Sequence, residues 1–514
     1  MAKRRVQQSS KDTTEIVRIS TGVPGLDTLL GGGFLEGGLY LIEGMAGTGK
    51  TILSSQICFT QVQQGGNVLY VTLIAESHVK LVQHLRGMSY FDPDTLAKSF
   101  ILISGYDPLS TGGLKAFLEL IVRSVRKHRP AFMVIDGFRA TNELQARPGA
   151  LPEFIHQLNT FITGVRCTTV LLAPFSGNDP RPEHTLVDGL IELNHYASGM
   201  RRAREIEVHK IRASHHMQGR HTFEITNDGV VIYPRLEALH VEPVSASRRS
   251  AARMRFGIPS FDRILGGGVM AGSATSVLGP PGTAKTLLGL QFLEAGIRGR
   301  ERSLYCGFYE PPEGLIRKAA AVGIELNAAL KSGALQIIWQ PPVERSLDQW
   351  GYALLETVRA NKISRLFIDG IERVRDVTLH PERFALFIAA LCNQLRALNA
   401  TTLFSEETAL YGEQINHTAS AITAVIDNMI VLRHVELRSQ SYRLISILKL
   451  REGGYDNAIH EFSISAEGLL VTASSQSAED ILTGKGATTP KPPDSPSRSA
   501  GKMSAAHGAR RRRK

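Results

Sequence analysis

The sequence predicts an α/β protein built from two tandem P-loop nucleotide-binding domains, each with a parallel sheet flanked by helices. Three observations lead to this prediction. A glycine-rich phosphate-binding motif occurs twice, at residues 44–51 and 279–286. Each copy lies between an apolar run typical of a buried strand and a segment typical of a helix. The residues around the two copies also match each other without a gap, which indicates a duplicated domain.

The two motifs carry the residues that hold a nucleotide phosphate chain. Their glycines let backbone N–H groups turn toward the β-phosphate, the lysine reaches the β- and γ-phosphates, and the hydroxyl is placed for Mg²⁺ at a helix N-terminus. The sequence therefore predicts ATP and Mg²⁺ as ligands of both domains. The predicted ATP-binding residues of the first motif are Gly44, Gly47, Thr48, Gly49, Lys50 and Thr51. Those of the second motif are Gly279, Gly282, Thr283, Ala284, Lys285 and Thr286.

The second motif departs from the first at one position, where Ala284 replaces the last glycine. A Cβ is compatible with the loop there if the φ angle is negative, although it narrows the freedom of the backbone. Because Lys285 and Thr286 are kept, we expect the second domain to bind ATP. We do not expect its rate of hydrolysis to equal that of the first domain.

An aspartate follows a later apolar strand in each copy. The strands are predicted over residues 131–135 and 365–368, and they end in Asp136 and Asp369. After a P-loop, an aspartate at this place holds Mg²⁺ beside the P-loop hydroxyl. The predicted metal residues are thus Thr51, Asp136, Thr286 and Asp369.

A glutamate follows the strand after each P-loop helix. These residues are Glu76 and Glu310, at the carboxyl end of strands predicted next to the P-loop, where a ligand crevice forms. Each is a candidate for orienting or deprotonating the attacking water. The alternative is a solvated glutamate at the end of a strand.

Both copies end in a β-rich segment with two basic residues one position apart. They are Lys210 with Arg212, and Lys449 with Arg451. Alternate residues of a strand share a face, so each pair points in one direction and could reach the γ-phosphate of a neighbouring subunit. The competing interpretation is an exposed edge strand protected by basic residues.

The net charge of +11 is concentrated at the ends of the chain. Residues 1–11 carry +4 and residues 475–514 carry +6, which leaves +1 for the segment between them. This distribution allows contact with nucleic acid only through the basic tails. The C-terminal tail has two interpretations, a solubilising extension or a docking arm for an acidic partner.

Bulk composition places the chain among cytoplasmic globular proteins. No apolar run reaches the roughly 18 residues of a membrane helix, and the first residues do not resemble a secretory signal. The cysteines Cys58, Cys167, Cys306 and Cys392 are far apart and are expected to be buried free thiols. The predicted organisation is a disordered N-terminus (1–15), a first domain (16–239), a linker (240–253), a second domain (254–474) and a disordered basic tail (475–514).

Across residues 16–470 the sequence resembles KaiC and the broader KaiC-like ATPases of the RecA superfamily. The resemblance rests on the two P-loops, on a Gly-x-Pro-x-Leu/Phe-Asp segment that opens each copy near Gly22 and Gly257, and on the Lys-x-Arg strands. It implies two RecA-like domains stacked as a double-ring homohexamer, with ATP between subunits. It favours a contact of Lys210, Arg212, Lys449 and Arg451 with the neighbour's nucleotide, and it adds His216 to the nucleotide site.

The resemblance also implies an unidentified protein partner and Ser/Thr autokinase activity in the second domain. Only half of the family's Ser-Thr pair is present, at Thr423, because alanine follows it. Adjacent family glutamates are likewise reduced to single residues, Glu76 and Glu310. We therefore expect a slow ATPase that signals through its conformation. The alternatives are a RecA/RadA-like DNA-binding ATPase and a nucleotide-gated scaffold without turnover.

Overall fold

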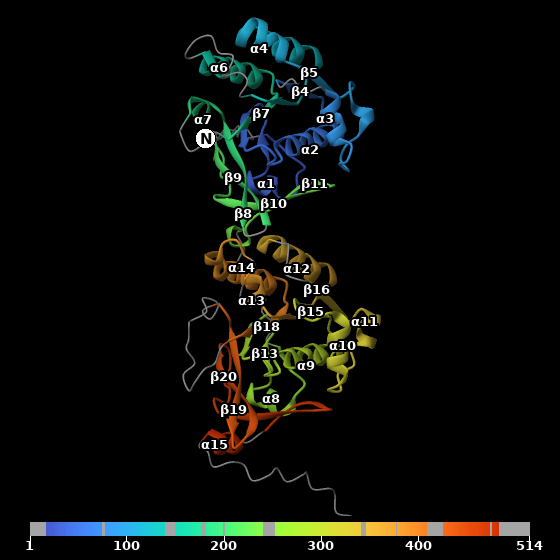
Figure 1. Cartoon of the computed structure of the whole chain (residues 1–514), viewed down its shortest axis with the longest axis vertical. Helices are drawn as coiled ribbons and strands as arrows, with labels where there is room; N and C mark the ends of the chain where they lie inside the picture. Colours follow the sequence, from blue (N-terminus) through green and yellow to red (C-terminus); the bar gives the residue numbers. More distant parts are fainter. Residues whose placement is uncertain are drawn as a thin grey trace, which may run out of the picture.

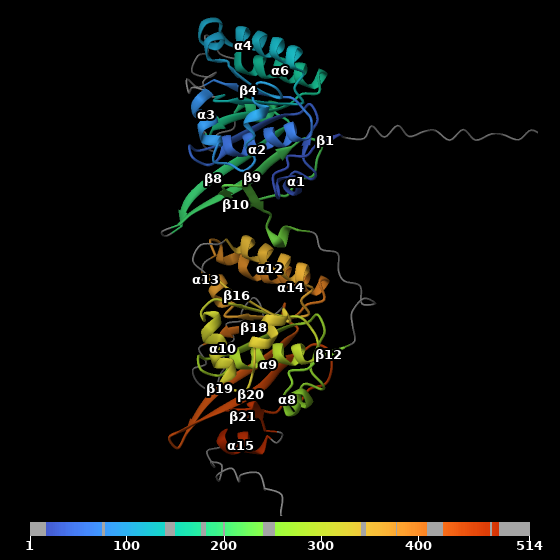
Figure 2. The ribbon, with the colours of Figure 1, turned by 90° about the vertical axis from the view of Figure 1, so that its right-hand side faces the viewer.

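The computed structural model consists of two domains that lie one above the other, with the first domain at the top of Figures 1 and 2. The described residues are 17–73, 78–138, 150–175, 181–198, 201–239, 252–340, 346–376, 378–408, 425–472 and 475–482. The predicted N-terminal disorder lies outside these residues. The predicted domain limits remain predictions, although a strand that belongs to the second domain already begins at Arg253.

The first domain contains short helices at both ends and long helices on both faces of its sheet. Its strands are β1 (Arg18–Ile19), β2 (Phe34–Leu35), β3 (Leu39–Gly44), β4 (Val68–Thr72), β5 (Phe100–Ser104), β6 (Phe132–Asp136), β7 (Thr168–Pro174), β8 (Gly189–Ser198), β9 (Arg201–Ile211), β10 (Arg220–Thr226) and β11 (Gly229–Tyr233). Its helices are α1 (Leu26–Leu29), α2 (Lys50–Gln63), α3 (His78–Leu85), η1 (Pro93–Thr95), α4 (Tyr106–His128), α6 (Ala150–Gly164), α7 (Pro182–Leu186) and η2 (Leu236–Ala238).

The second domain repeats this order of elements. Its strands are β12 (Arg253–Met254), β13 (Val269–Met270), β14 (Ala274–Gly279), β15 (Ser303–Gly307), β16 (Leu335–Trp339), β17 (Arg365–Asp369), β18 (Thr401–Glu407), β19 (Asn428–Leu437), β20 (Gln440–Leu450), β21 (His460–Ser465) and β22 (Gly468–Val471). Its helices are α8 (Pro259–Ile264), α9 (Lys285–Arg298), α10 (Pro312–Ala320), α11 (Asn327–Ser332), α12 (Leu347–Asn361), α13 (Glu372–Asp376), η4 (Pro381–Arg383), α14 (Phe384–Ala397) and α15 (Gln476–Leu482).

The large sheets of the two domains have the same topology. Their strand orders are β5-β4-β6-β7-β3-β8-β9-β10-β11 and β16-β15-β17-β18-β14-β19-β20-β21-β22. Strands up to β8 and β19 pair in parallel, and the remaining strands of each sheet are antiparallel. The P-loop strands β3 and β14 lie inside the parallel part. This arrangement confirms the predicted tandem α/β fold with parallel sheets flanked by helices.

Each sheet is covered on both faces by apolar helix surfaces. In the first domain, α2 and α3 pack in one core, and α4 and α6 pack in the other. In the second domain, α8 to α11 cover one face and α12 to α14 cover the other. The parallel strands are apolar on both faces because both faces are buried. The four cysteines are buried and unpaired, as the sequence predicts.

The opening segment of each domain is fixed by an aspartate. The Asp27 carboxylate accepts hydrogen bonds from the N–H and the hydroxyl of Thr21, at 2.9 and 2.7 Å. In the second domain, Asp262 accepts N–H bonds from Phe256 and Gly257, at 2.7 and 3.1 Å. These bonds explain why the repeated segment keeps an aspartate at this position.

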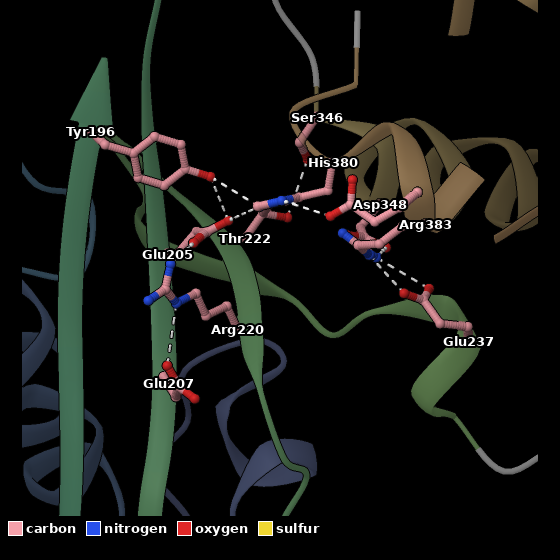
Figure 3. A network of polar contacts seen from close by, with 11 residues as sticks. Tyr196, Glu205, Glu207, Arg220, Thr222, Glu237, Ser346, Asp348, His380 and Arg383 are labelled. Atoms are coloured by element: carbon pink, nitrogen blue, oxygen red, sulfur yellow. Dashed lines mark hydrogen bonds and ion pairs between the residues drawn. The ribbon is translucent and has the colours of Figure 1, made fainter. Parts of the chain in front are cut away.

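The two domains are joined by an apolar contact and a polar network. Leu236 of η2 is fully buried in the apolar cluster formed by α12 and α14 of the second domain. Around it, Arg383 bonds to Glu237 and Asp348, as Figure 3 shows. On the other side of the junction, the His380 ring lies 3.0 Å from a Glu205 oxygen. The junction therefore orders the first domain's last segment against the second domain's upper helices.

One predicted boundary is wrong. The tail was expected to be disordered from residue 475, but residues 476–482 form α15. This helix buries Ala478 and Ile481 against Leu444 of β20. The prediction of disorder rested on the average composition of the tail, which does not show that two apolar residues at its start can pack against the domain. Among the described residues, no helix is both long and apolar enough to cross a membrane.

Candidate nucleotide-binding sites

The first P-loop connects the buried strand β3 to helix α2. The Lys50 ammonium group donates hydrogen bonds to the carbonyl oxygens of Gly44 and Met45, at 2.6 and 3.0 Å. Burial lowers the pKa of Lys50, and nearby Asp136 opposes that shift. The Thr48 hydroxyl bonds inside the loop to the Met45 carbonyl at 2.9 Å, so its observed role is to fix the loop. The loop therefore holds the Lys50 ammonium group beside the backbone of the predicted phosphate-binding loop.

The second P-loop has the same local geometry between β14 and α9. Lys285 Nζ lies 2.8 Å from the Gly279 carbonyl and 2.9 Å from that of Pro280, and burial lowers its pKa. The Thr283 hydroxyl bonds to the Pro280 carbonyl at 2.8 Å, as Thr48 does in the first loop. The loop opens into a cleft of about 520 Å³. A cleft of this size is in the range of small-ligand sites.

Each P-loop hydroxyl meets the predicted aspartate of its domain. Thr51 Oγ1 donates to Asp136 at 3.3 Å, and Thr286 Oγ1 donates to Asp369 at 2.8 Å. Burial raises the pKa of Asp136, and hydrogen bonds from Tyr70 and Thr51 oppose the shift. Hydroxyl and carboxylate oxygens are ligands that Mg²⁺ prefers, so the chemistry of both pairs fits this ion.

A tyrosine missed by the sequence analysis supports each aspartate. Tyr70 and Tyr305 donate their hydroxyl hydrogens to Asp136 and Asp369, at 2.8 and 2.9 Å. The pKa of each phenol is raised by burial and by its aspartate. Both tyrosines occupy the same place in the strand that follows the P-loop helix, and this recurrence in the two copies is the sequence signal that could have identified them.

The structure corrects the expected backbone geometry at Ala284. Its φ angle is +72°, in the left-handed region, and not negative. The equivalent Gly49 has a φ angle of +104°. The partly buried Ala284 instead packs against the hydrophobic core of the domain. The second P-loop therefore keeps the glycine-type conformation with an alanine in place.

The strands before the two predicted glutamates end earlier than expected. Strand β15 ends at Gly307, three residues before Glu310, so the prediction that the strand ends in this carboxylate is wrong. Glu310 lines the cleft, but its carboxylate is paired with Lys318 at 2.5 Å. In the first domain β4 ends at Thr72, and Glu76 lies outside the described residues.

Both basic pairs bind carbonyl or carboxylate groups of their own domain, and Arg212 and Arg451 directly follow the ends of β9 and β20. Lys210 Nζ donates to three carbonyl oxygens at the end of α7, at 2.8 to 3.1 Å, while Arg212 bonds to the Thr185 carbonyl at 2.6 Å. In the second domain, Lys449 bonds to the Ile426 carbonyl at 2.6 Å, and Arg451 lies 3.0 Å from Asp427. Burial lowers the pKa of both lysines.

Two predicted residues have no observed place in a site. His216 is partly buried, and burial together with the adjacent His215 lowers its pKa. No contact between His216 and a P-loop is found within the described part of its own chain. Thr423 lies outside the described residues. Both stay predictions.

The second site contains polar residues that the first site lacks. Ser405, at the end of β18, donates to Asp369 at 2.5 Å, and Glu407 follows it on the cleft wall. By strand register, the first domain has Leu172 and Pro174 at these places. The sequence signal was Ser-Glu-Glu at residues 405–407 of one copy against Leu-Ala-Pro at residues 172–174 of the other.

Glu372 is a further cleft residue that the sequence analysis missed. It starts α13, three positions after Asp369, and its side chain lines the cleft. Burial raises the pKa of Glu372 to about 6, and the charges of Glu407 and Glu406 add to the shift. The sequence signal that could have identified Glu372 is its position close to Asp369, the predicted metal-binding residue.

Strand, P-loop, helix and a hydroxyl–aspartate pair, repeated in two domains, define a tandem P-loop ATPase. The KaiC ATPase family model matches residues 19–237 and again residues 254–476. The chain therefore belongs to the KaiC ATPase family.

The chain is similar to cyanobacterial clock proteins over most of its length. It is 28% identical to the circadian clock oscillator protein KaiC of Picosynechococcus sp. over 488 residues, which cover 91% of this chain and 92% of that protein. It is 27% identical to the circadian clock oscillator protein KaiC 1 of Synechocystis sp., with 91% and 92% covered. It is 28% identical to the circadian clock protein KaiC3 of the same organism, with 92% and 95% covered.

Proposed function

We propose that this protein binds and slowly hydrolyses Mg·ATP at two non-equivalent sites, and that the nucleotide state of the sites changes its conformation. The observation that carries the proposal is the repeated contact between the P-loop hydroxyl and the aspartate, from Thr51 to Asp136 and from Thr286 to Asp369. A P-loop lysine lies beside each pair. These are the groups that hold the phosphates and the metal in this class of ATPase.

Mg²⁺ would be held at Thr51 with Asp136 and at Thr286 with Asp369, where it would neutralise charge on the β- and γ-phosphates. Lys50 and Lys285 exchange their carbonyl partners for phosphate oxygens when ATP binds. The partly buried setting strengthens these contacts, because charges attract more strongly where water is excluded.

We further propose that the ATP sites are completed by a neighbouring subunit in a homohexamer. The Lys210–Arg212 and Lys449–Arg451 pairs supply the transition-state cations in trans, and His216 lies near the neighbour's nucleotide. About half of the Arg212 and Arg451 side chains is exposed, at 51% and 52%, which supports an outward contact. Removing such a cation costs about 10³ to 10⁵ in turnover where it has been measured.

The output we propose is a conformational signal to a protein partner. The named relatives are circadian clock proteins, which supports a timing or signalling role. Autophosphorylation at Thr423 is a separate hypothesis, and its test is phosphosite mapping after incubation with ATP. A Thr423→Ala variant is the control for that mapping.

Steady-state phosphate release tests the proposal. We expect the Lys50→Ala and Lys285→Ala variants each to remove the turnover of one site, and the double variant to release no phosphate above background. Fluorescent-nucleotide binding and a sizing column with ATP are measured in parallel. Wild-type protein that binds ATP and assembles without releasing phosphate would show a nucleotide-gated scaffold, and the ATPase proposal would be wrong.

The second alternative, a RecA/RadA-like DNA-binding ATPase, is distinguished by its charge. The segment between the tails carries a net charge of only +1, whereas a DNA-binding face needs clustered Lys and Arg. DNA-binding titrations of the full chain and of chains without residues 1–11 or 484–514 separate the cases. DNA binding that survives removal of both tails would favour this alternative.

A further inference from the structure

We propose that Glu372 is the catalytic carboxylate of the second site, the group that accepts the proton of the attacking water. This inference rests on the proposed ATPase function and deepens it, because it assigns the water-activating role to a residue outside the predicted set.

The position of Glu372 follows from the order of the strands. β17 carries Asp369, and β18 lies between β17 and the P-loop strand β14. Glu372 lies three residues beyond the carboxyl end of β17, at the start of α13, and it lines the cleft together with Lys285 and Thr286. Ligands of parallel sheets bind at this end of the strands.

The Glu372 side chain is fixed at the cleft wall. It is only 7% exposed, and its carboxylate lies 3.4 Å from the backbone N–H of Glu407 on β18. It is also among the charges that act on the Lys285 ammonium group. A carboxylate held by neighbouring backbone, and not by a cation, keeps an oxygen available for water.

Glu310, the carboxylate that the sequence singles out, is in a different situation. Like Glu372, it lines the cleft and lies three residues beyond the end of a strand, but one of its oxygens is held by Lys318 at 2.5 Å. A base must first give up such a contact before it can bind the proton of a water molecule. Glu372 has no cation within ion-pair distance among the described residues.

The electrostatics of Glu372 also suit proton transfer. Burial raises its pKa to about 6, with Glu407 and Glu406 adding to the shift. General bases work best when their pKa lies near the working pH, because the group is then both ionised and basic. Glu372 meets this condition near neutral pH.

The proposed step balances without a further reactant. The oxygen of water forms a bond to the γ-phosphorus while the bond from that phosphorus to the β,γ-bridging oxygen breaks. The electron pair of the broken bond stays on the bridging oxygen, which leaves as part of ADP. One proton of the water passes to a Glu372 oxygen and is later released to solvent, and the products are ADP and inorganic phosphate.

The test is made in full-length protein carrying Lys50→Ala, so that turnover comes from the second site. We expect Glu372→Gln to lower kcat by at least about 100-fold, with KM and fluorescent-nucleotide binding unchanged, because glutamine keeps the volume but cannot accept the proton. Glu310→Gln is expected to lower kcat less. The exposed Glu313→Gln is the matched control, with unchanged kcat.

The Glu372→Asp variant tests whether the loss of kcat in Glu372→Gln comes from a change of structure and not from the loss of a proton acceptor. This variant keeps a carboxylate and is expected to regain at least tenfold in kcat over Glu372→Gln. A large loss in Glu310→Gln together with a retained kcat in Glu372→Gln would overturn the inference while leaving the ATPase function intact. A Lys50→Ala parent that binds ATP without phosphate release would overturn the proposed turnover at this site and the inference with it.

Discussion

The equivalent P-loop residues Gly49 and Ala284 reach the same left-handed backbone with different side chains. A Cβ added at Gly49 would lie 2.5 Å from the Ile225 Cδ1 atom, and its φ angle is +104°. Ala284 already carries a Cβ at a φ angle of +72°, and it packs against the hydrophobic core of its domain. A left-handed alanine costs roughly 1–2 kcal/mol, so the two loops hold different amounts of strain.

We therefore predict opposite effects of exchanging these residues. Gly49→Ala should lower the free energy of unfolding by at least about 1–2 kcal/mol, through the left-handed backbone and the clash with Ile225. Ala284→Gly should raise it by less than about 1 kcal/mol, since relieved strain is partly offset by the loss of one buried methyl group. Urea unfolding of both variants measures the difference, and a destabilised Ala284→Gly protein would show that the methyl contact outweighs the strain.

For single residues, the sequence predicts those site residues that follow from the order of strand, loop and helix along the chain. The lysine, hydroxyl and aspartate of each site were identified because strand, loop and helix follow each other directly. Glu372, Ser405 and the two supporting tyrosines were missed, because their role depends on which strands lie side by side. The sequence analysis allowed an alanine at residue 284 on condition of a negative φ angle, whereas the backbone holds Ala284 at +72°.

Among the elements, α15 shows how few contacts order a helix at the end of a domain. Its buried residues Ala478 and Ile481 contact Leu444, and Ile481 is only 2% exposed. The neighbouring Leu482 is 50% exposed. The helix is short, so its stability depends on this packing and not on helix propensity.

We predict that Ile481→Ala detaches α15 without unfolding the domain. Removing a buried isoleucine costs about 2–5 kcal/mol, more than a seven-residue helix retains by itself. Amide hydrogen exchange should therefore show loss of protection over residues 476–482 only. The control, Leu482→Ala, should leave protection unchanged, and equal loss in both variants would mean that α15 is held by other contacts.

The order and type of the main elements are largely predictable from the sequence, because each apolar run is short, bounded and repeated in both copies. The two copies of the phosphate-binding motif were placed correctly between a buried strand and a helix, as β3 with α2 and β14 with α9 show. Strand ends were less predictable, as β15 and β4 show. The residue at which a strand ends depends on its pairing with neighbouring strands. The hydrophobic periodicity of a single segment does not reveal that pairing.

For the whole molecule, the junction between the domains concentrates buried charge. Asp348 is fully buried, and its carboxylate lies 3.0 Å from the Arg383 guanidinium group, which also bonds to Glu237 (Figure 3). Burial raises the pKa of Asp348, and Arg383 opposes that shift. The sequence does not reveal this cluster, since Glu237 lies more than a hundred residues from both Asp348 and Arg383, which are themselves 35 residues apart.

We predict that Arg383→Met destabilises the protein by about 3–5 kcal/mol, because it leaves the buried Asp348 without its cation. The double variant Arg383→Met with Asp348→Asn should recover part of this loss. Arg298→Met is the control, since Arg298 is 73% exposed in its ion pair with Glu294 and its loss should cost less than about 1 kcal/mol. Thermal and urea unfolding measure the changes. A loss no larger than that of the control would mean that the apolar contact of Leu236 alone holds the junction.

The same junction should weaken in acid through His221. This ring is fully buried, and its Nδ1 atom accepts the backbone N–H of Arg235 at 3.0 Å, so its proton lies on Nε2. Burial lowers the pKa of His221 to about 4, and the charges of Arg235 and Arg383 act in the same direction, while Glu237 opposes them. In the unfolded chain the ring titrates near 6.5, so between these values the unfolded state binds more protons.

The resulting stability is complete above about pH 6.5 and is lost as the pH falls toward 4. A shift of this size corresponds to about 3 kcal/mol. His221→Gln keeps an acceptor for the Arg235 N–H but does not titrate. Subtracting the unfolding free energies of the variant from those of the wild type across pH 4 to 7 cancels the other titrating groups. We expect the difference to fall by up to about 3 kcal/mol toward pH 4, and parallel curves would show that His221 does not couple protons to the junction.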